Sequence, residues 1–120
     1  MLIPLRNYSN YSICESNIKI DDLVNFAEKE KLPAMALTDY KLLSGALEFS
    51  TKCKNKGIQP IIGLDVDYIS KLNHKSRLTF LCKNEIGFKN LNILSTKINT
   101  ENEFHLSLNN INNFSEGNIL

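Results

Sequence analysis

The sequence predicts an α/β fold in which parallel strands alternate with helices. Short apolar segments alternate with segments whose apolar residues recur at helical spacing, and turn-forming residues separate the two kinds. This alternation implies right-handed crossovers between parallel strands that are buried on both faces. The fold would be a doubly wound sheet or part of a (β/α) barrel, and both place functional residues at the carboxyl ends of strands.

The first half of the chain is expected to contain two strands and two helices. In chain order, these are a strand over residues 2–8, a helix over 20–31, a strand over 34–38 and a helix over 42–56. Pro4 places the first strand at a sheet edge, because proline cannot donate to a strand ladder. Asp21 is a candidate N-cap for the first helix, which must end before Pro33. Gly57 is suited to end the second helix in the left-handed conformation.

The second half of the chain is expected to add further strands and helices. In chain order, these are a strand over 59–69, a polar turn over 70–76, a strand over 77–83, a helix over 86–98, a short helix over 106–114 and a strand starting at 117. The carboxyl ends of all predicted strands fall near positions 8–10, 39–40, 65 and 83–84. A functional site, if the chain has one, is expected at these positions.

Charge and cysteine content exclude several classes of protein. The net charge of +1 provides no overall attraction to nucleic acid or to an anionic membrane. Cys14, Cys53 and Cys82 are scattered and form no C-x-x-C motif, which indicates reduced thiols. The sequence has no long apolar run and no basic stretch followed by an apolar block, so we expect a cytoplasmic protein without a membrane anchor.

Few of the polar residues in the sequence are candidates for a catalytic role. Asp39, at a strand end, is either a carboxylate that supports a functional site or the N-cap of the helix that follows. Ser9 and Ser12 lack the paired His or Asp pattern of a hydrolase nucleophile. His74 and His105 have no second ligand at metal spacing and are expected to be solvated surface residues.

Four ordered stretches carry a resemblance to a known family. They are LRNYSNYS at 5–12, LPAMALTD at 32–39, GIQPIIG at 57–63 and LCKNEIGFKNL at 81–91. Together they resemble the polymerase and histidinol phosphatase (PHP) domain that opens the alpha subunit of bacterial DNA polymerase III. The resemblance implies a PHP-type distorted (β/α) barrel, whose active members hold a metal cluster and cleave phosphoesters.

The resemblance also identifies the positions at which active members place their metal site. In this chain they are occupied by Pro4, Tyr8, Glu15, Asp39, Tyr40, Asp65 and Arg77, and the aligned histidines are all replaced. Pro4 offers no ligand, and a tyrosine must first lose a proton with a pKa of about 10. Arg77 brings a permanent positive charge to the place of a cation. We therefore expect no catalytic residue, no metal and no cofactor, and an ion-pair network that joins Glu15 and Asp65 to the arginine.

The resemblance implies a structural role in DNA replication. The chain would be a non-catalytic PHP segment of a replicative DNA-directed DNA polymerase, packed on the remaining polymerase domains in cis. It would help to dock a proofreading exonuclease subunit and would meet DNA only through the parent polymerase. The alternatives are a metal-dependent PHP phosphoesterase, acting as a 3′–5′ exonuclease or small-molecule phosphatase, and a stand-alone α/β interaction domain.

Length sets an expectation about completeness. A full (β/α) barrel needs about 250 residues, so residues 1–120 would form the N-terminal portion of a single PHP domain. An open half-barrel exposes unpaired strand edges, so we expect the chain either to self-associate through those edges or to settle into a modified sheet.

Overall fold

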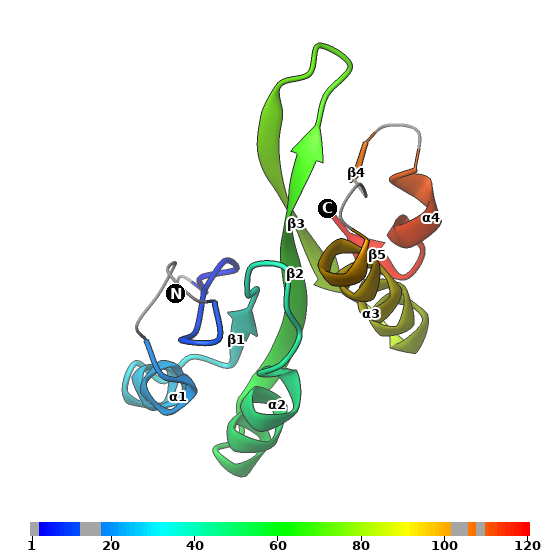
Figure 1. Ribbon diagram of the computed structural model, residues 1–120. Helices are drawn as coiled ribbons and strands as arrows, with labels where there is room; N and C mark the ends of the chain where they lie inside the picture. Colours follow the sequence, from blue (N-terminus) through cyan, green and yellow to red (C-terminus); the bar gives the residue numbers. More distant parts are fainter. Residues whose placement is uncertain (1–2, 13–17, 102–105, 108–109) are drawn as a thin grey trace.

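The chain folds into one mixed sheet with helices packed beside it (Figure 1). The computed structural model describes residues 3–12, 18–101, 106–107 and 110–120. The helices are α1 (Ile20–Lys29), α2 (Ala46–Asn55), α3 (Glu85–Thr100) and α4 (Asn112–Ser115). The strands are β1 (Ala34–Leu37), β2 (Gln59–Ile69), β3 (Lys75–Cys82), β4 (Leu106–Ser107) and β5 (Asn118–Ile119).

Strand β2 is the centre of the sheet. It pairs in parallel with β1 through its first residues and with β4 through its last two. On its other edge it pairs antiparallel with β3, which in turn pairs antiparallel with β5. The α/β class and the partial-barrel character predicted from the sequence are confirmed, and β1, α2 and β2 form the expected parallel crossover unit.

The direction of β3 differs from the all-parallel expectation. Strands β2 and β3 are joined by a short turn in which the backbone amide of Ser70 donates to the carbonyl of His74 at 3.0 Å. Such a turn cannot supply the crossover that parallel neighbours require, so the two strands form an antiparallel hairpin. The tip of this hairpin projects from the rest of the molecule (Figure 1). Its reversal carries the start of β3, and not its end, to the carboxyl-terminal part of β2.

The ends of the chain also depart from expectation. The described residues of the predicted first strand form no ladder, although the amide of Thr38 donates to the carbonyl of Asn7 at 2.8 Å. The single helix predicted over 106–114 is wrong, because strand β4 and the short helix α4 occupy this region instead. The strand predicted from 117 is present as β5.

Helix boundaries follow local backbone chemistry. Lys19, and not Asp21, is the N-cap of α1, and Asp21 lies in the first turn, where its charge favours the helix dipole. Helix α2 begins at Ala46, four residues after the predicted start. Gly57 follows α2 with a φ of 71°, as predicted, and Asn84 caps α3 by accepting from the amide of Gly87 at 3.0 Å.

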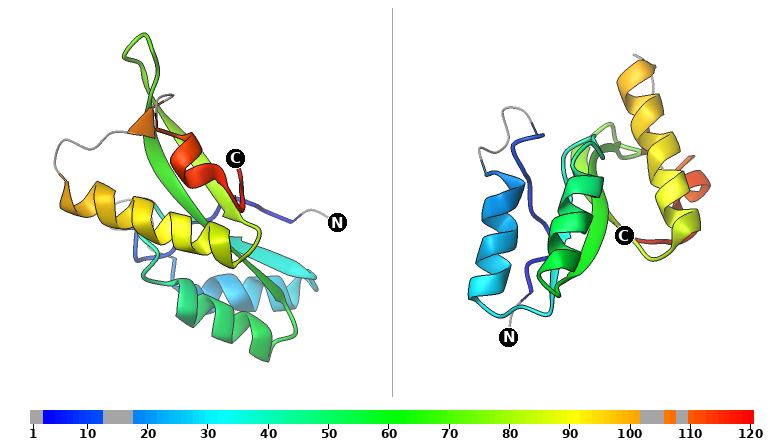
Figure 2. Two further views of the ribbon diagram at one scale, coloured as in Figure 1. Left: turned by 90° about the vertical axis from the view of Figure 1, so that its right-hand side faces the viewer. Right: turned by 90° about the horizontal axis from the view of Figure 1, so that it is seen from below.

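Two apolar clusters hold the fold together, one at each half of β2. The first joins α1, α2 and β1 through residues that include Ile20, Val24, Met35, Leu37, Phe49 and Cys53. The second joins β2 and β3 to α3 and α4 through Leu64, Val66, Phe80, Leu91, Leu94, Leu106 and Phe114. Figures 1 and 2 show α1 and α2 around the first half of β2, and α3 and α4 beside its second half.

Candidate functional site

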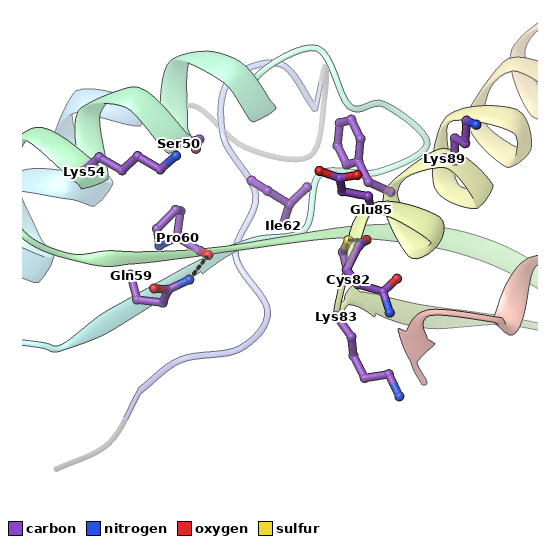
Figure 3. A pocket seen from close by; sticks show the side chains of 11 residues that line it. Ser50, Lys54, Gln59, Pro60, Ile62, Cys82, Lys83, Glu85 and Lys89 are labelled. Carbon is purple, nitrogen blue, oxygen red and sulfur yellow. Dashed lines mark hydrogen bonds between the residues drawn. The ribbon is translucent and has the colours of Figure 1, made fainter.

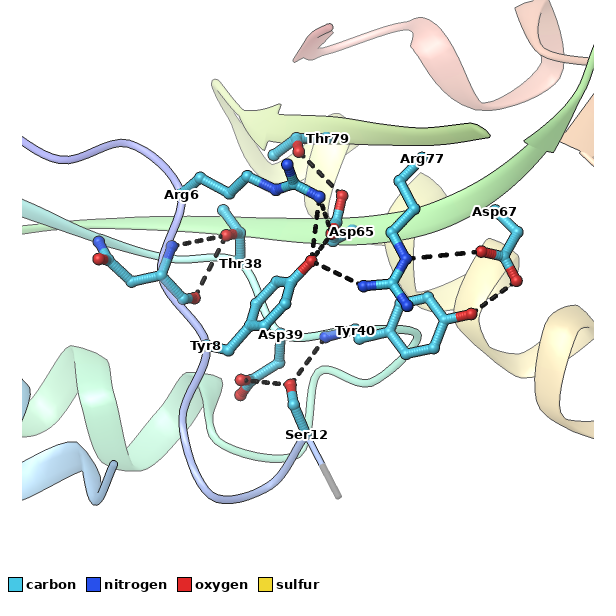
Figure 4. Close-up of polar contacts among 11 residues, drawn as sticks. Arg6, Tyr8, Ser12, Thr38, Asp39, Tyr40, Asp65, Asp67, Arg77 and Thr79 are labelled. Carbon is cyan, nitrogen blue, oxygen red and sulfur yellow. Dashed lines mark hydrogen bonds and ion pairs between the residues drawn. The ribbon is translucent and has the colours of Figure 1, made fainter. Parts of the chain in front are cut away.

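A buried carboxylate, Asp65, lies at the middle of β2 and binds three side chains from two other segments (Figure 4). One carboxylate oxygen accepts from Arg6 Nη2 at 2.8 Å and from the hydroxyl of Tyr8. The other oxygen accepts from Thr79 Oγ1 at 2.9 Å. Asp65 has no exposed surface, so these donors replace the water that the carboxylate loses on folding.

Register within the hairpin creates this arrangement. Asp65 and Asp67 are two residues apart on β2 and therefore point to the same face of the sheet. Their antiparallel partners on β3 are Thr79 and Arg77, in that order. Each acid thus faces its own partner, as expected when directly opposed residues interact across a strand pair.

Asp67 is the centre of a second cluster. Its carboxylate accepts from the hydroxyl of Tyr40 at 2.6 Å and lies 3.2 Å from Lys41 Nζ and 3.4 Å from Lys75 Nζ. The guanidinium of Arg77 lies 4.0 Å from the centre of the Tyr40 ring, a cation–π contact. Arg77 Nη1 also donates to the hydroxyl of Tyr8 at 3.3 Å and so connects the Asp67 cluster to Asp65.

The surroundings of Asp67 shift two pKa values. Burial by itself raises the pKa of Asp67, but the hydrogen bonds from Tyr40, Lys41 and Lys75 and the charge of Lys41 hold the pKa below its usual range. The pKa of Lys41 is raised, because its contacts with Tyr40 and Asp67 outweigh the opposing effect of burial. Both pKa shifts favour the charged forms of Asp67 and Lys41.

Asp67→Asn is expected to weaken the acid sensitivity of the fold. A carboxylate whose folded pKa lies below the ordinary value of 3.8 stabilises the protein above that value, and the contribution disappears as pH falls through the lowered pKa. Urea unfolding of the wild type and the variant between about pH 2 and pH 6 measures the effect. Asp22→Asn, which removes an exposed charge from α1, is the matched control. If the stability curves of wild type and Asp67→Asn run parallel below pH 4, this account of Asp67 is wrong.

Asp39 fixes the N-terminal segment to the end of β1. Its carboxylate accepts from the amide of Ser9 at 2.6 Å, from the Ser9 hydroxyl at 2.7 Å and from the Ser12 hydroxyl at 2.8 Å. Asp39 is not the N-cap of α2, because Gly45 holds that place. Both serine hydroxyls donate to this acid, an arrangement that holds the segment in place.

The structure brings together four of the residues singled out by sequence. Tyr8, Tyr40, Asp65 and Arg77 share one network, with Asp39 beside it, since the Ser12 hydroxyl that binds Asp39 also accepts from the amide of Tyr40 at 2.9 Å. Pro4 contributes only its carbonyl, which accepts from the side chain of Asn7 at 3.1 Å. Glu15 and His105 lie outside the described residues. His74 is exposed in the hairpin turn, and Lys83 and Asn84 lie beyond the end of β3, away from the network.

Several participants in the network were missed, among them the two lysines beside Asp67, Lys41 and Lys75. Arg6, Asp67 and Thr79 supply the cation, the second acid and a hydroxyl donor of the network. The signal was present in the sequence, because Asp65 and Asp67 alternate along one strand, and Arg77 and Thr79 alternate along the next. These alternating residues could be recognised as pairs that face each other only once the two strands were known to form an antiparallel hairpin.

The residues present do not fit a metal cluster. Clustered divalent cations need several imidazoles and carboxylates that converge on them. Among the described residues, no group of three or more His, Cys, Asp or Glu side chains converges in this way. Asp65 is already bound by an arginine, and Asp67 is surrounded by three basic side chains. Two open hollows of about 350 and 290 Å³ flank Arg77, the first lined by Arg6, Tyr8 and Arg77.

Comparison with known proteins defines the class to which this fold and site belong. The PHP domain family matches residues 4–119, and the chain belongs to that family. Among the described residues, no helix is long and apolar enough to span a membrane.

Curated relatives of the chain include proteins named DNA polymerase III subunit alpha. The chain is 40% identical over 114 residues to the DNA polymerase III subunit alpha of Chlamydia pneumoniae, covering 86% of this chain and 9% of that protein. It is 38% identical over 97 residues to the subunit of the same name from Vibrio cholerae, covering 79% of this chain and 8% of that protein. The chain is therefore homologous to a small part of these relatives and spans less than a tenth of their length.

Solved structures confirm the fold. An amidohydrolase from Chromobacterium violaceum, with bound sulfate and no metal, matches 76% of this chain and 32% of its own, with a TM-score of 0.61 and 21% identity. A proposed metal-dependent phosphoesterase from Bifidobacterium adolescentis matches 96% of this chain and 43% of its own, with a TM-score of 0.59 and 11% identity. At these identities the likeness concerns the fold alone.

Proposed function

We propose that this chain is a non-catalytic, structural segment of the PHP domain of a DNA polymerase III alpha subunit. The observation that carries the proposal is the polar network on Asp65 and Asp67. It includes Tyr8, Tyr40, Asp65 and Arg77, four of the positions that by resemblance correspond to the metal site of active PHP domains. Arginine and lysine side chains supply the positive charge, and tyrosine and threonine hydroxyls supply the hydrogen bonds. The network keeps the barrel mouth filled and ordered without a reaction centre.

The proposal extends to the whole protein. Residues 1–120 would be the N-terminal portion of one PHP domain, packed in cis on the other domains of a cytoplasmic polymerase that extends DNA. The identity to polymerase III alpha subunits supports this assignment. Docking of a proofreading exonuclease and self-association of the chain through strand edges belong to the same proposal.

Metal analysis of the purified chain tests the proposal. We expect less than about 0.1 equivalent of bound Mn²⁺ or Zn²⁺ per chain after dialysis, because the acids already have cationic partners. We also expect no turnover of a generic phosphodiester such as bis-p-nitrophenyl phosphate in added Mn²⁺. Asp65→Asn, which removes the charge but retains the shape, serves as the comparison in both assays.

One outcome would establish the metal-dependent phosphoesterase instead. Stoichiometric metal with turnover, both lost in Asp65→Asn while circular dichroism shows a folded chain, would overturn the structural assignment. The present contacts favour the structural reading, because Asp65 accepts three hydrogen bonds within the protein.

A further inference from the structure

An open groove lies between α2 and α3, toward the end of β2 that is remote from the polar network (Figure 3). Its volume is about 670 Å³. The floor comes from the first half of β2 and the end of β3, and the two walls come from the helices. Gln59 and Pro60 mark the start of β2 in this groove, whereas Asp65 and Asp67 lie farther along the same strand.

The rim of the groove is basic. Lys54 on α2, Lys83 after β3 and Lys89 on α3 line it, against the single acidic residue Glu85. Within the described part of the chain, none of these three lysines forms an ion pair, whereas Lys52 and Lys56 on α2 are paired with acids. The rim therefore presents positive charge that the described residues do not neutralise.

The inside of the groove is apolar. Pro60, Ile62, Cys82 and Phe88 line it, and Phe88 is 36% exposed. On α2, Leu47 is 80% exposed and lies seven residues before Lys54, on the same side of the helix. A large apolar side chain beside a basic rim and an apolar floor is typical of a surface that binds a partner.

We propose that this groove binds an acidic amphipathic segment of a partner protein, whose apolar side chains enter between α2 and α3 while its carboxylates meet the three lysines. An amphipathic helix laid in an apolar groove is a recurring mode of peptide recognition, and complementary charge selects the partner. A nucleic acid fits less well, because the lining of the groove contains a single aromatic residue, Phe88, on which a base could stack. The inference does not depend on the network at Asp65 and Asp67, because none of the residues that line the groove belongs to that network.

A titration with designed peptides tests the inference on the ¹⁵N-labelled chain. The probe is an amphipathic peptide of about 12 residues, three helical turns, with Leu on one face and Glu on the other. We expect amide shift changes at Ile62, Lys83 and Phe88, and saturable binding. The same peptide with Lys in place of Glu should bind at least about tenfold more weakly.

Substitutions in and outside the groove test whether the acidic peptide binds there. Lys54→Glu with Lys89→Glu should lower the affinity for the acidic peptide at least about tenfold, and Leu47→Ala should lower it more modestly. Lys29→Glu reverses an exposed charge at the end of α1, outside the groove, and should leave the affinity unchanged. Circular dichroism of each variant verifies folding, so that a loss of binding is not confused with a loss of structure.

Several results would overturn the inference. Equal binding of the acidic and basic peptides would show nonspecific apolar association. Tighter binding of an oligothymidylate than of the acidic peptide would assign the lysines to nucleic acid. Absence of any shift change at millimolar acidic peptide would show that the groove does not bind this class of ligand.

Discussion

Replacing Asp65 with alanine is expected to lower the free energy of unfolding by about 3 kcal/mol. The change removes the acceptor shared by Arg6, Tyr8 and Thr79 and leaves a hole in a fully buried site. The side chain of Arg6 is 54% exposed, so its charge regains water in the variant, and the cost stays below that of leaving a wholly buried charge unpaired. Urea unfolding at neutral pH, followed by circular dichroism, gives the difference directly.

The matched control is Asp22→Ala, which removes an exposed carboxylate from α1 and should change stability by less than about 0.5 kcal/mol. Thr79→Val isolates one hydrogen bond of the Asp65 network and should cost about 1 kcal/mol. If Asp65→Ala costs no more than Asp22→Ala, the network does not stabilise the fold, and the structural assignment of the site loses its main support.

Phe80→Ala is expected to destabilise the chain by about 4 kcal/mol, the largest effect among the substitutions considered. Phe80 is fully buried at the centre of the second apolar cluster, where β3 meets α3 and α4. Truncation removes its contacts and leaves a cavity that the surrounding strands and helices cannot fill. Thermal and urea unfolding both report the loss.

Phe26→Ala is the control for Phe80→Ala, because it makes the same substitution at an exposed position. Phe26 is 49% exposed on α1, so its truncation should cost less than about 1 kcal/mol. Comparable losses for Phe26 and Phe80 would contradict the burial pattern of the fold.

Secondary structure was predictable wherever the periodicity of apolar residues was long and uninterrupted. The segments now seen as α1, β1, α2, β2, β3 and α3 were all expected, with boundaries that moved by a few residues. The periodicity of apolar residues did not give the direction of β3. The usable signal was the short polar turn predicted over 70–76, because parallel neighbours require a much longer crossover connection. The prediction for residues 106–114 failed because short mixed segments fit helix and strand equally well.

Apolar residues at helical spacing overstated the buried faces. Phe26, Leu47, Phe88 and Ile93 are apolar residues within the predicted helices, yet all four are substantially exposed. The periodicity of apolar residues locates the apolar face of a helix but not the width of the part that is buried. That width depends on which neighbouring element packs against the helix. Phe88 lines the groove between α2 and α3, and Leu47 lies on the same side of α2 as Lys54, which also lines it, so part of this exposed apolar surface lies at or beside the groove.

The candidate site was predictable in position but not in connectivity. Resemblance to PHP domains located Tyr8, Tyr40, Asp65 and Arg77, and the structure places all four in one network. The expected bond between Asp65 and Arg77 is replaced by one between Asp65 and Arg6, because cross-strand register assigns Arg77 to Asp67. Contacts between segments far apart in sequence require the fold before they can be assigned.

Strand β2 runs through both apolar clusters, with Ile62 packed on the first and Leu64 and Val66 inside the second. If one end of β2 loses its strand pairing, the apolar cluster at its other end is destabilised as well. The two apolar clusters are therefore thermodynamically coupled. The chain is therefore expected to unfold in a single cooperative transition, and amide hydrogens along β2 should exchange only through that global event.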